Sequence, residues 1–235
     1  MTRYDYTGPP TGYGYYQPGV REPGRITTSP TEIAHILIAA VVLSADIAFI
    51  QVRGFVLGGV ALPGGVWLEA LAIGVAAALT GFVFHELAHK IAAQRRGYWA
   101  EFRMSPMGLV FSVITAFIGF LFAAPGATVV QDMADRRDWG ITGLAGPVVN
   151  LVEGGAFAAA GFGLFYLGGF GAWVPFLFVL GFFNGWFATF NLIPLGPLDG
   201  RKVLAWNTGV WAAAIVVSGL LAASAFLIAY GIVTL

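Results

Sequence analysis

The sequence contains no cysteine, only three histidines and few charged residues, which make up 10% of its 235 positions. Without cysteine, disulfide bonds and thiolate metal ligands are excluded, so histidine and carboxylate side chains remain as protein ligands for a metal. With 58% hydrophobic residues and a mean hydropathy of +0.79, the chain is unlike an ordinary soluble domain. Its 12 basic and 12 acidic residues balance, so nothing in the net charge favours nucleic acid as a partner.

Long apolar runs separated by short Gly-rich or polar stretches are typical of an all-α polytopic membrane protein in a lipid bilayer. We expect about five transmembrane helices, within residues 33–50, 66–93, 141–167, 171–193 and 208–233. Residues 29–32, Ser-Pro-Thr-Glu, resemble a capping box with proline at the first helical position, which predicts where the first helix begins. Residues 1–29 are rich in Tyr, Gly and Pro without apolar periodicity, which predicts a disordered tail.

The segment between the second and third predicted spans is the least regular part of the pattern. Residues 99–104 resemble a short strand, and residues 111–130 form an apolar run long enough to span a membrane. If that run crossed, Arg136 and Arg137 would lie on the side opposite to the basic residues that follow the second span, against the positive-inside rule. We therefore expect a re-entrant or strand-containing hairpin, and a cytoplasmic N-terminus.

An HExxH pentad, His85-Glu86-Leu87-Ala88-His89, lies near the end of the second predicted span. Residues four apart on an α-helix are separated by about 40° around its axis, so both imidazoles can reach one metal ion. In this motif the histidines are zinc ligands, and the glutamate is the general base that takes a proton from water. The metal is expected inside the bilayer, about one or two helical turns from its cytoplasmic surface.

A catalytic zinc needs three protein ligands, so the two histidines require a partner. The metzincin spacing would put a third histidine at position 95, which is Arg95, so that class is excluded. Asp199 follows two prolines at the end of the fourth span, and such a turn can direct one carboxylate back toward the pentad. His35 and Glu153 remain alternative ligands, while Asp46 is interpreted as a polar partner within the bundle.

Three motifs follow one another along the chain: HELAH at 85–89, GPVVN at 146–150 and NLIPLGPLDG at 191–200. In this order they resemble the site-2 protease family of intramembrane zinc metalloproteases. The resemblance covers about residues 66–204 and implies a catalytic core of three helices there. Residues 30–65 would then form a first helix with its connection, and residues 205–235 a C-terminal transmembrane helix.

The family resemblance also implies a role for each site residue. His85, His89 and Asp199 would bind one Zn²⁺ per chain, and Glu86 would activate water as the general base. Asn150, the last residue of GPVVN, would face the site and hold the substrate carbonyl or stabilise its oxyanion.

The activity that the resemblance implies is hydrolysis of peptide bonds within or near transmembrane segments of single-span membrane proteins. The expected location is a prokaryotic plasma membrane, with the active site toward the cytoplasm. Two alternative functions remain open, neither of them proteolysis. The chain could be a polytopic transporter in which His85, Glu86 and His89 form an ion relay, or a catalytically inactive membrane scaffold.

Overall fold

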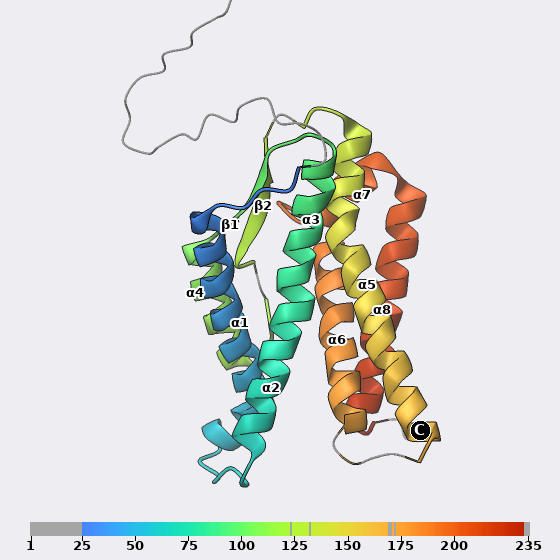
Figure 1. Cartoon of the computed structure of the whole chain (residues 1–235). Coiled ribbons are helices and arrows are strands. Elements are labelled where there is room, and N and C mark those ends of the chain that lie inside the picture. The colour runs from blue at the N-terminus through green and yellow to red at the C-terminus, as the bar shows by residue number, and fades with distance from the viewer. Residues whose placement is uncertain (1–24, 123, 132, 169–170, 172, 233–235) are drawn as a thin grey trace, which may run out of the picture.

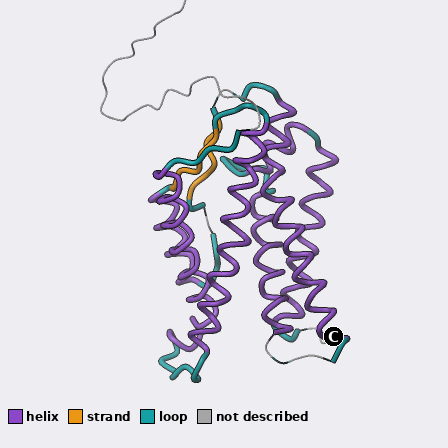
Figure 2. Tube along the Cα trace, viewed as in Figure 1, coloured by secondary structure: helices purple, strands orange, loops and turns teal. Residues whose placement is uncertain are grey.

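A computed structural model describes residues 25–122, 124–131, 133–168, 171 and 173–232. The molecule is a bundle of helices with a small sheet at one end (Figures 1 and 2). The predicted tail, 1–29, lies outside the described residues except for residues 25–29, which form neither helix nor strand. The elements in chain order are α1 (Pro30–Leu57), α2 (Val66–Ala78), the π-helical turn η1 (Leu79–Val83), α3 (Phe84–Arg95), β1 (Ala100–Met104), α4 (Pro106–Ile118), β2 (Gly126–Val130), α5 (Arg136–Tyr166), α6 (Trp173–Asn191), α7 (Asp199–Trp206) and α8 (Thr208–Ala229).

Among the described residues, five helices are long and apolar enough to cross a membrane. They are α1, the continuous helix Val66–Arg95 made of α2, η1 and α3, then α5, α6 and α8. Their number and order match the five predicted spans. The chain is therefore a mostly helical membrane protein, as its apolar runs indicate.

The segment between the second and third of these helices does not form a further spanning helix. Its helix α4 has 13 residues and is about 20 Å long, against a hydrocarbon thickness of about 30 Å. The following β2 pairs with β1 in antiparallel register, from Ala100 opposite Val130 to Met104 opposite Gly126. The predicted strand near residues 99–104 is present, and the apolar run 111–130 contains part of α4 and all of β2. Its re-entry into the membrane stays a prediction.

The side chain of Ser29 caps the N-terminus of α1. Ser29 accepts a hydrogen bond from the backbone N–H of Glu32 at 3.1 Å, and Pro30 is the first residue of α1, as predicted. The second half of the predicted capping box is wrong. The Glu32 carboxylate does not return to Ser29 but bonds to Lys90 and to the N–H of Phe102, because a buried cation offers a stronger partner than a helix-end amide.

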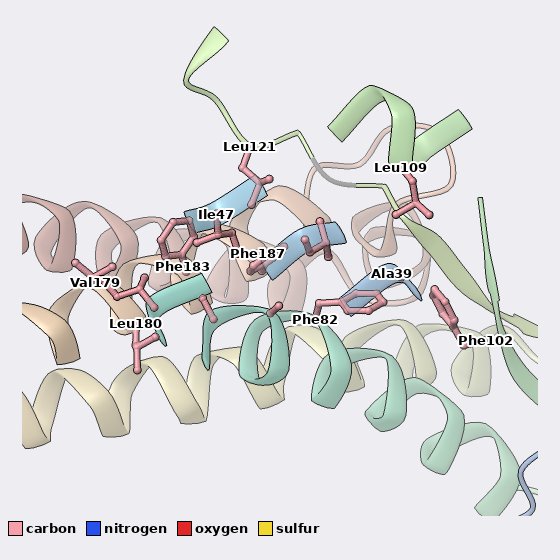
Figure 3. Close-up of a cluster of buried hydrophobic side chains, with 14 residues drawn as sticks. Ala39, Ile47, Phe82, Phe102, Leu109, Leu121, Val179, Leu180, Phe183 and Phe187 are labelled. Carbon is pink, nitrogen blue, oxygen red and sulfur yellow. The ribbon is translucent and has the colours of Figure 1, made fainter. Parts of the chain in front are cut away.

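The hydrophobic core joins both sides of the bundle. Its buried side chains come from α1, α2, η1, β1, α4, α6 and, at Leu121, the loop after α4. Phe82 packs edge-on against Phe102 at 5.4 Å between ring centroids (Figure 3). Small residues let the helices approach closely: a Cβ on Gly74 would lie 2.2 Å from the carbonyl oxygen of Ser44 in α1. Such contacts are typical of helix packing in membranes, where close approach replaces the hydrophobic driving force.

The sheet and the short helix α7 lie at the same end of the bundle (Figure 1). Figure 1 shows β1, β2, the end of α3 and the short helix α7 at this end, while α8 ends at the opposite one. The continuous helix Val66–Arg95 runs toward the sheet end, so its HELAH segment lies in the half of the helix nearest to the sheet.

Candidate metal centre

His85 and His89 are both in α3, which follows the π-helical turn η1 directly. Both side chains are buried, with 3% and 5% of their surface exposed. Their Nε2 atoms lie 2.9 Å apart. The spacing of four residues thus brings the two imidazoles to one point, as the pentad predicts.

Asp199 reaches the same point from another part of the chain. It is the first residue of α7, after a loop that leaves the end of α6. Its Oδ2 lies 2.9 Å from Nε2 of His89 and 3.3 Å from Nε2 of His85. The loop folds tightly behind it, because a Cβ on Gly200 would lie 2.0 Å from the carbonyl oxygen of Leu192. The three side chains form a buried group whose ligand atoms could hold a metal ion.

The hydrogen bonds of the two imidazoles determine which nitrogens are available. Nδ1 of His89 lies 2.6 Å from the backbone carbonyl oxygen of Thr142, which can only accept, so this nitrogen carries the proton. Nδ1 of His85 lies 2.5 Å from Oδ1 of Asn150 and donates in the same way. Both Nε2 atoms therefore keep a lone pair directed at the other and at Asp199.

This donor set fits a zinc ion. Nε2 of His85, Nε2 of His89 and Oδ2 of Asp199 lie within 3.3 Å of one another, and each directs a lone pair at the others. Without a proton between them these atoms repel unless a cation lies among them. Two imidazole nitrogens and one carboxylate oxygen are a ligand set that catalytic zinc sites use. The backbone of α5 also passes close to the group, since a Cβ on Gly146 would lie 2.4 Å from Nε2 of His89. The first glycine of GPVVN thus leaves room beside the ligand atoms.

Asp199, the candidate third ligand, has a hydrogen-bond partner of its own. Nζ of Lys202, three residues along α7, donates to Oδ1 of Asp199 at 2.8 Å and leaves Oδ2 facing the histidines. Burial would raise the pKa of Asp199, but the neighbouring His89 imidazole and the Lys202 ammonium hold that pKa well below its ordinary value. Burial would lower the pKa of Lys202, yet the Asp199 carboxylate raises it. Asp199 is therefore ionised, as a metal ligand must be.

Glu86 faces a small cavity beside this group. Its Oε2 accepts hydrogen bonds from the backbone N–H of Thr128 at 2.9 Å and from the Thr128 hydroxyl at 2.8 Å. The cavity has a volume of about 60 Å³, and its lining includes Glu86, Thr128, His89, Asp199 and Lys202. Strand β2 thus holds one oxygen of the predicted base at the edge of a space that can contain water.

Comparison with known proteins agrees with this donor set. A Methanocaldococcus jannaschii protein described as a "putative zinc metalloprotease" is 38% identical over 136 residues, which are 57% of this chain and 69% of that protein. The chain belongs to this zinc metalloprotease family. No family model matches the chain, and no solved structure matches it.

Within this zinc metalloprotease fold, the alternative ligands lie elsewhere. Nδ1 of His35, in α1, accepts a long hydrogen bond of 3.4 Å from the N–H of Met104. Asp46 accepts one from the Ser112 hydroxyl at 2.7 Å, which agrees with its interpretation as a structural partner. Among the described residues, the group that could hold a metal consists of His85, His89 and Asp199, and Glu153 is not part of it.

Asn150 contacts Nδ1 of His85, the ring nitrogen that does not face Asp199. It is 0% exposed, and its Nδ2 donates to the Gly81 carbonyl at 2.9 Å and to Oδ1 of Asn184 at 3.2 Å. It is not among the residues that line the cavity. Its predicted contact with the substrate carbonyl stays a prediction, whereas its contact with His85 is part of the folded structure.

Sequence analysis did not identify the partners that hold these site residues. Thr142 acts through its backbone carbonyl and Thr128 through a strand of the sheet, so neither has a side-chain motif that could have revealed it. Asn184 lies in α6, in the apolar run that precedes NLIPLGPLDG. Lys202 lies three positions after Asp199 on the same face of α7, but the sequence pattern did not predict that helix.

Proposed function

We propose that the protein is an intramembrane zinc metalloprotease of the site-2 protease type, which hydrolyses peptide bonds within or near transmembrane segments of single-span membrane proteins. The observation that carries the proposal is the position of the metal-binding group. His85, Glu86 and His89 lie within Val66–Arg95, a helix long and apolar enough to cross the bilayer, and Asp199 meets them there. A buried ionisable cluster in such a helix is costly without a function.

His85, His89 and Asp199 would hold the zinc through two Nε2 atoms and Oδ2. When bound, zinc supplies Lewis-acid polarisation of the scissile carbonyl and lowers the pKa of water. Glu86 acts as general base: Thr128 holds its Oε2 through two hydrogen bonds, which leaves Oε1 to take the proton and pass it to the leaving amine.

The cavity limits what reaches the site in this conformation. A volume of about 60 Å³ holds a few water molecules but not an extended peptide. A substrate segment therefore enters only after the lining elements, β2 among them, move apart. The substrate must change as well, because a transmembrane helix hides its carbonyl groups in internal hydrogen bonds. We expect the preferred substrates to contain residues that weaken a helix.

The distribution of charge supports a cytoplasmic active site. Basic residues lie at the end of α3 and just after it, at the start of α5 and within α7, among them Arg95, Arg96 and Arg201. The connections 58–65 and 167–172, which join α1 to α2 and α5 to α6, contain no lysine or arginine. By the positive-inside rule the sheet end and the N-terminus face the cytoplasm. With an archaeal relative, a prokaryotic plasma membrane is the proposed location.

The test is cleavage in reconstituted vesicles of single-span reporters that differ only in the span, one built of leucine and one with a central Asn-Gly pair. We expect zinc-dependent cleavage, faster for the Asn-Gly reporter. Glu86→Gln should slow it at least about 100-fold, since a positioned base contributes roughly 10²- to 10⁴-fold. Glu69→Gln, which changes an exposed glutamate at the start of α2, is the matched control. Equal rates for wild type and Glu86→Gln would refute the proposal.

A further inference from the structure

A chain of buried polar side chains runs from His85 away from the cavity, into the apolar part of the bundle. It passes from Asn150 in α5 to Asn184 in α6 and ends at Thr80 in η1. Asn150 and Asn184 are both 0% exposed. Amides buried in an apolar environment are costly unless all their hydrogen bonds are made, and none of these three side chains is a candidate metal ligand or the general base.

At Thr80, where this series of polar side chains ends, the donors and acceptors can be arranged in only one way. The Thr80 hydroxyl lies 2.8 Å from the carbonyl oxygen of Ala76, which can only accept, so the hydroxyl proton is committed there. Thr80 Oγ1 must then accept from Asn184, whose Nδ2 lies 3.0 Å away. The second proton of this amide goes to the carbonyl oxygen of Leu180 at 3.1 Å. Asn184 therefore presents its Oδ1 to Asn150.

The hydrogen bonds of Asn150 fix the orientation of its amide in the same way. Nδ2 of Asn150 donates to Oδ1 of Asn184 and to the carbonyl oxygen of Gly81, so only its Oδ1 can face His85. An amide oxygen accepts, and His85 must therefore carry its proton on Nδ1. Its Nε2 is then free of a proton and directed at the group formed with His89 and Asp199.

We propose that Thr80 is a positioning residue for the metal centre, which acts through Asn184 and Asn150 to hold His85 in the tautomer that can bind zinc. The π-helical turn matters here, because it carries both the Thr80 hydroxyl and the Gly81 carbonyl that orient the two amides. Such turns often lie at functional sites. The inference rests on the zinc site of the proposed function.

The orientation of His85 depends on this series of polar side chains, whereas the orientation of His89 does not. His89 donates to the backbone carbonyl of Thr142, which cannot exchange its oxygen for a donor. His85 donates to a side-chain amide, which could rotate by half a turn and offer N–H₂ instead if nothing held it. The bonds that Asn150 donates to Asn184, and Asn184 to the Thr80 hydroxyl, prevent that rotation. Loss of the Thr80 hydroxyl should therefore disturb His85 and leave His89 unaffected.

The experiment measures zinc affinity by competition with a chromophoric chelator, in detergent, for wild type and four variants. We expect Thr80→Val, which keeps the shape but removes the hydroxyl, to weaken zinc binding about 10- to 100-fold, as is typical for a partner of a ligating histidine. Asn184→Leu should have an effect of the same direction and at least the same size. Thr80→Ser should bind zinc within about threefold of wild type, because it restores the hydroxyl.

Thr189→Val is the matched control. Thr189, in α6, makes the same bond to the carbonyl four residues back, Gly185, at 2.8 Å, without a contact to the polar chain. We expect it to bind zinc as wild type does. If Thr80→Val and Asn184→Leu both bind zinc as tightly as Thr189→Val, the inference is overturned while the zinc site stands. If wild type itself binds no zinc, the proposed function fails and the inference fails with it.

Discussion

Helix α3 carries residues of two buried polar clusters, and the difference between them explains why one of them is the candidate metal centre. The metal centre contains His85, His89 and Asp199. The second cluster, which we call the Lys90 clamp, consists of Lys90, its partner Glu32 and the groups bonded to them. His89 and Lys90 are neighbours in the chain, yet one side chain faces α5 and α7 and the other faces α1 and β1.

The Lys90 clamp is complete by itself. Nζ of Lys90 lies 2.5 Å from Oε2 of Glu32 and 2.7 Å from the Thr28 hydroxyl. Oε1 of Glu32 accepts from the N–H of Phe102 at 3.0 Å. The positive charge of Lys90 is balanced by the negative charge of Glu32, so the pair needs no further ion. The Lys90 clamp links α1 to α3 and β1.

The metal centre does not balance in this way. Its Nδ1 protons and the Lys202 ammonium satisfy the outer atoms, but two Nε2 lone pairs and one carboxylate oxygen converge with no donor among them. Both clusters are buried and both contain charge, so burial alone does not distinguish them. What distinguishes the candidate metal centre is a set of acceptors without donors, spaced closely enough to hold one metal ion.

The largest effect is expected from breaking the clamp. Glu32→Gln removes one charge of the pair and leaves Lys90 buried without its partner, which should lower the free energy of unfolding by about 3–5 kcal/mol. The measurement is reversible unfolding in detergent, with zinc affinity determined at a temperature where the variant is folded. Zinc affinity should match wild type.

The double variant Glu32→Gln/Lys90→Met is the control for this effect. It removes both charges and keeps an oxygen for the N–H of Phe102, so most of the lost stability should return. A double variant as unstable as Glu32→Gln alone would show that the ion pair is not what holds the clamp.

A smaller effect is expected at the metal centre from Lys202→Met. Without the bond from Nζ, the Asp199 carboxylate can rotate, and zinc should bind about 10- to 100-fold more weakly. The free energy of unfolding without zinc should change by less than about 1 kcal/mol, because the Lys202 side chain is partly exposed. Arg201→Met, which changes the exposed neighbour, should alter neither quantity. A loss of stability without a loss of zinc affinity would make Lys202 a second clamp.

The sequence was sufficient for the local parts of this arrangement. The spacing within HELAH brings two imidazoles together on one helix whatever surrounds it, and five long apolar runs have few uses other than crossing a membrane. Asp199 required the joint pattern with the pentad, because its position depends on a turn. The helix that it begins, α7, was not predicted, since its eight residues follow a stretch with two prolines.

The remaining parts depend on tertiary contacts that no local pattern encodes. Lys90 lies within the second predicted span, and no local pattern shows that it is 2% exposed and bonded to Glu32, 58 residues earlier in the chain. Asn184 looks like one polar residue in an apolar run, and its role appears only when α5 and η1 pack against α6. The π-helical turn likewise has no signature in a pattern of apolar residues.

The most direct test of the central claim is the zinc content of the purified wild type beside His85→Ala and Asp199→Ala. The structure predicts about one zinc per chain in wild type and a loss, or a weakening of more than about 100-fold, in both variants. Comparable folding in detergent would show that the loss is local. Zinc retained at full affinity by Asp199→Ala, or absent from well-folded wild type, would contradict the assignment of these three residues as the metal centre.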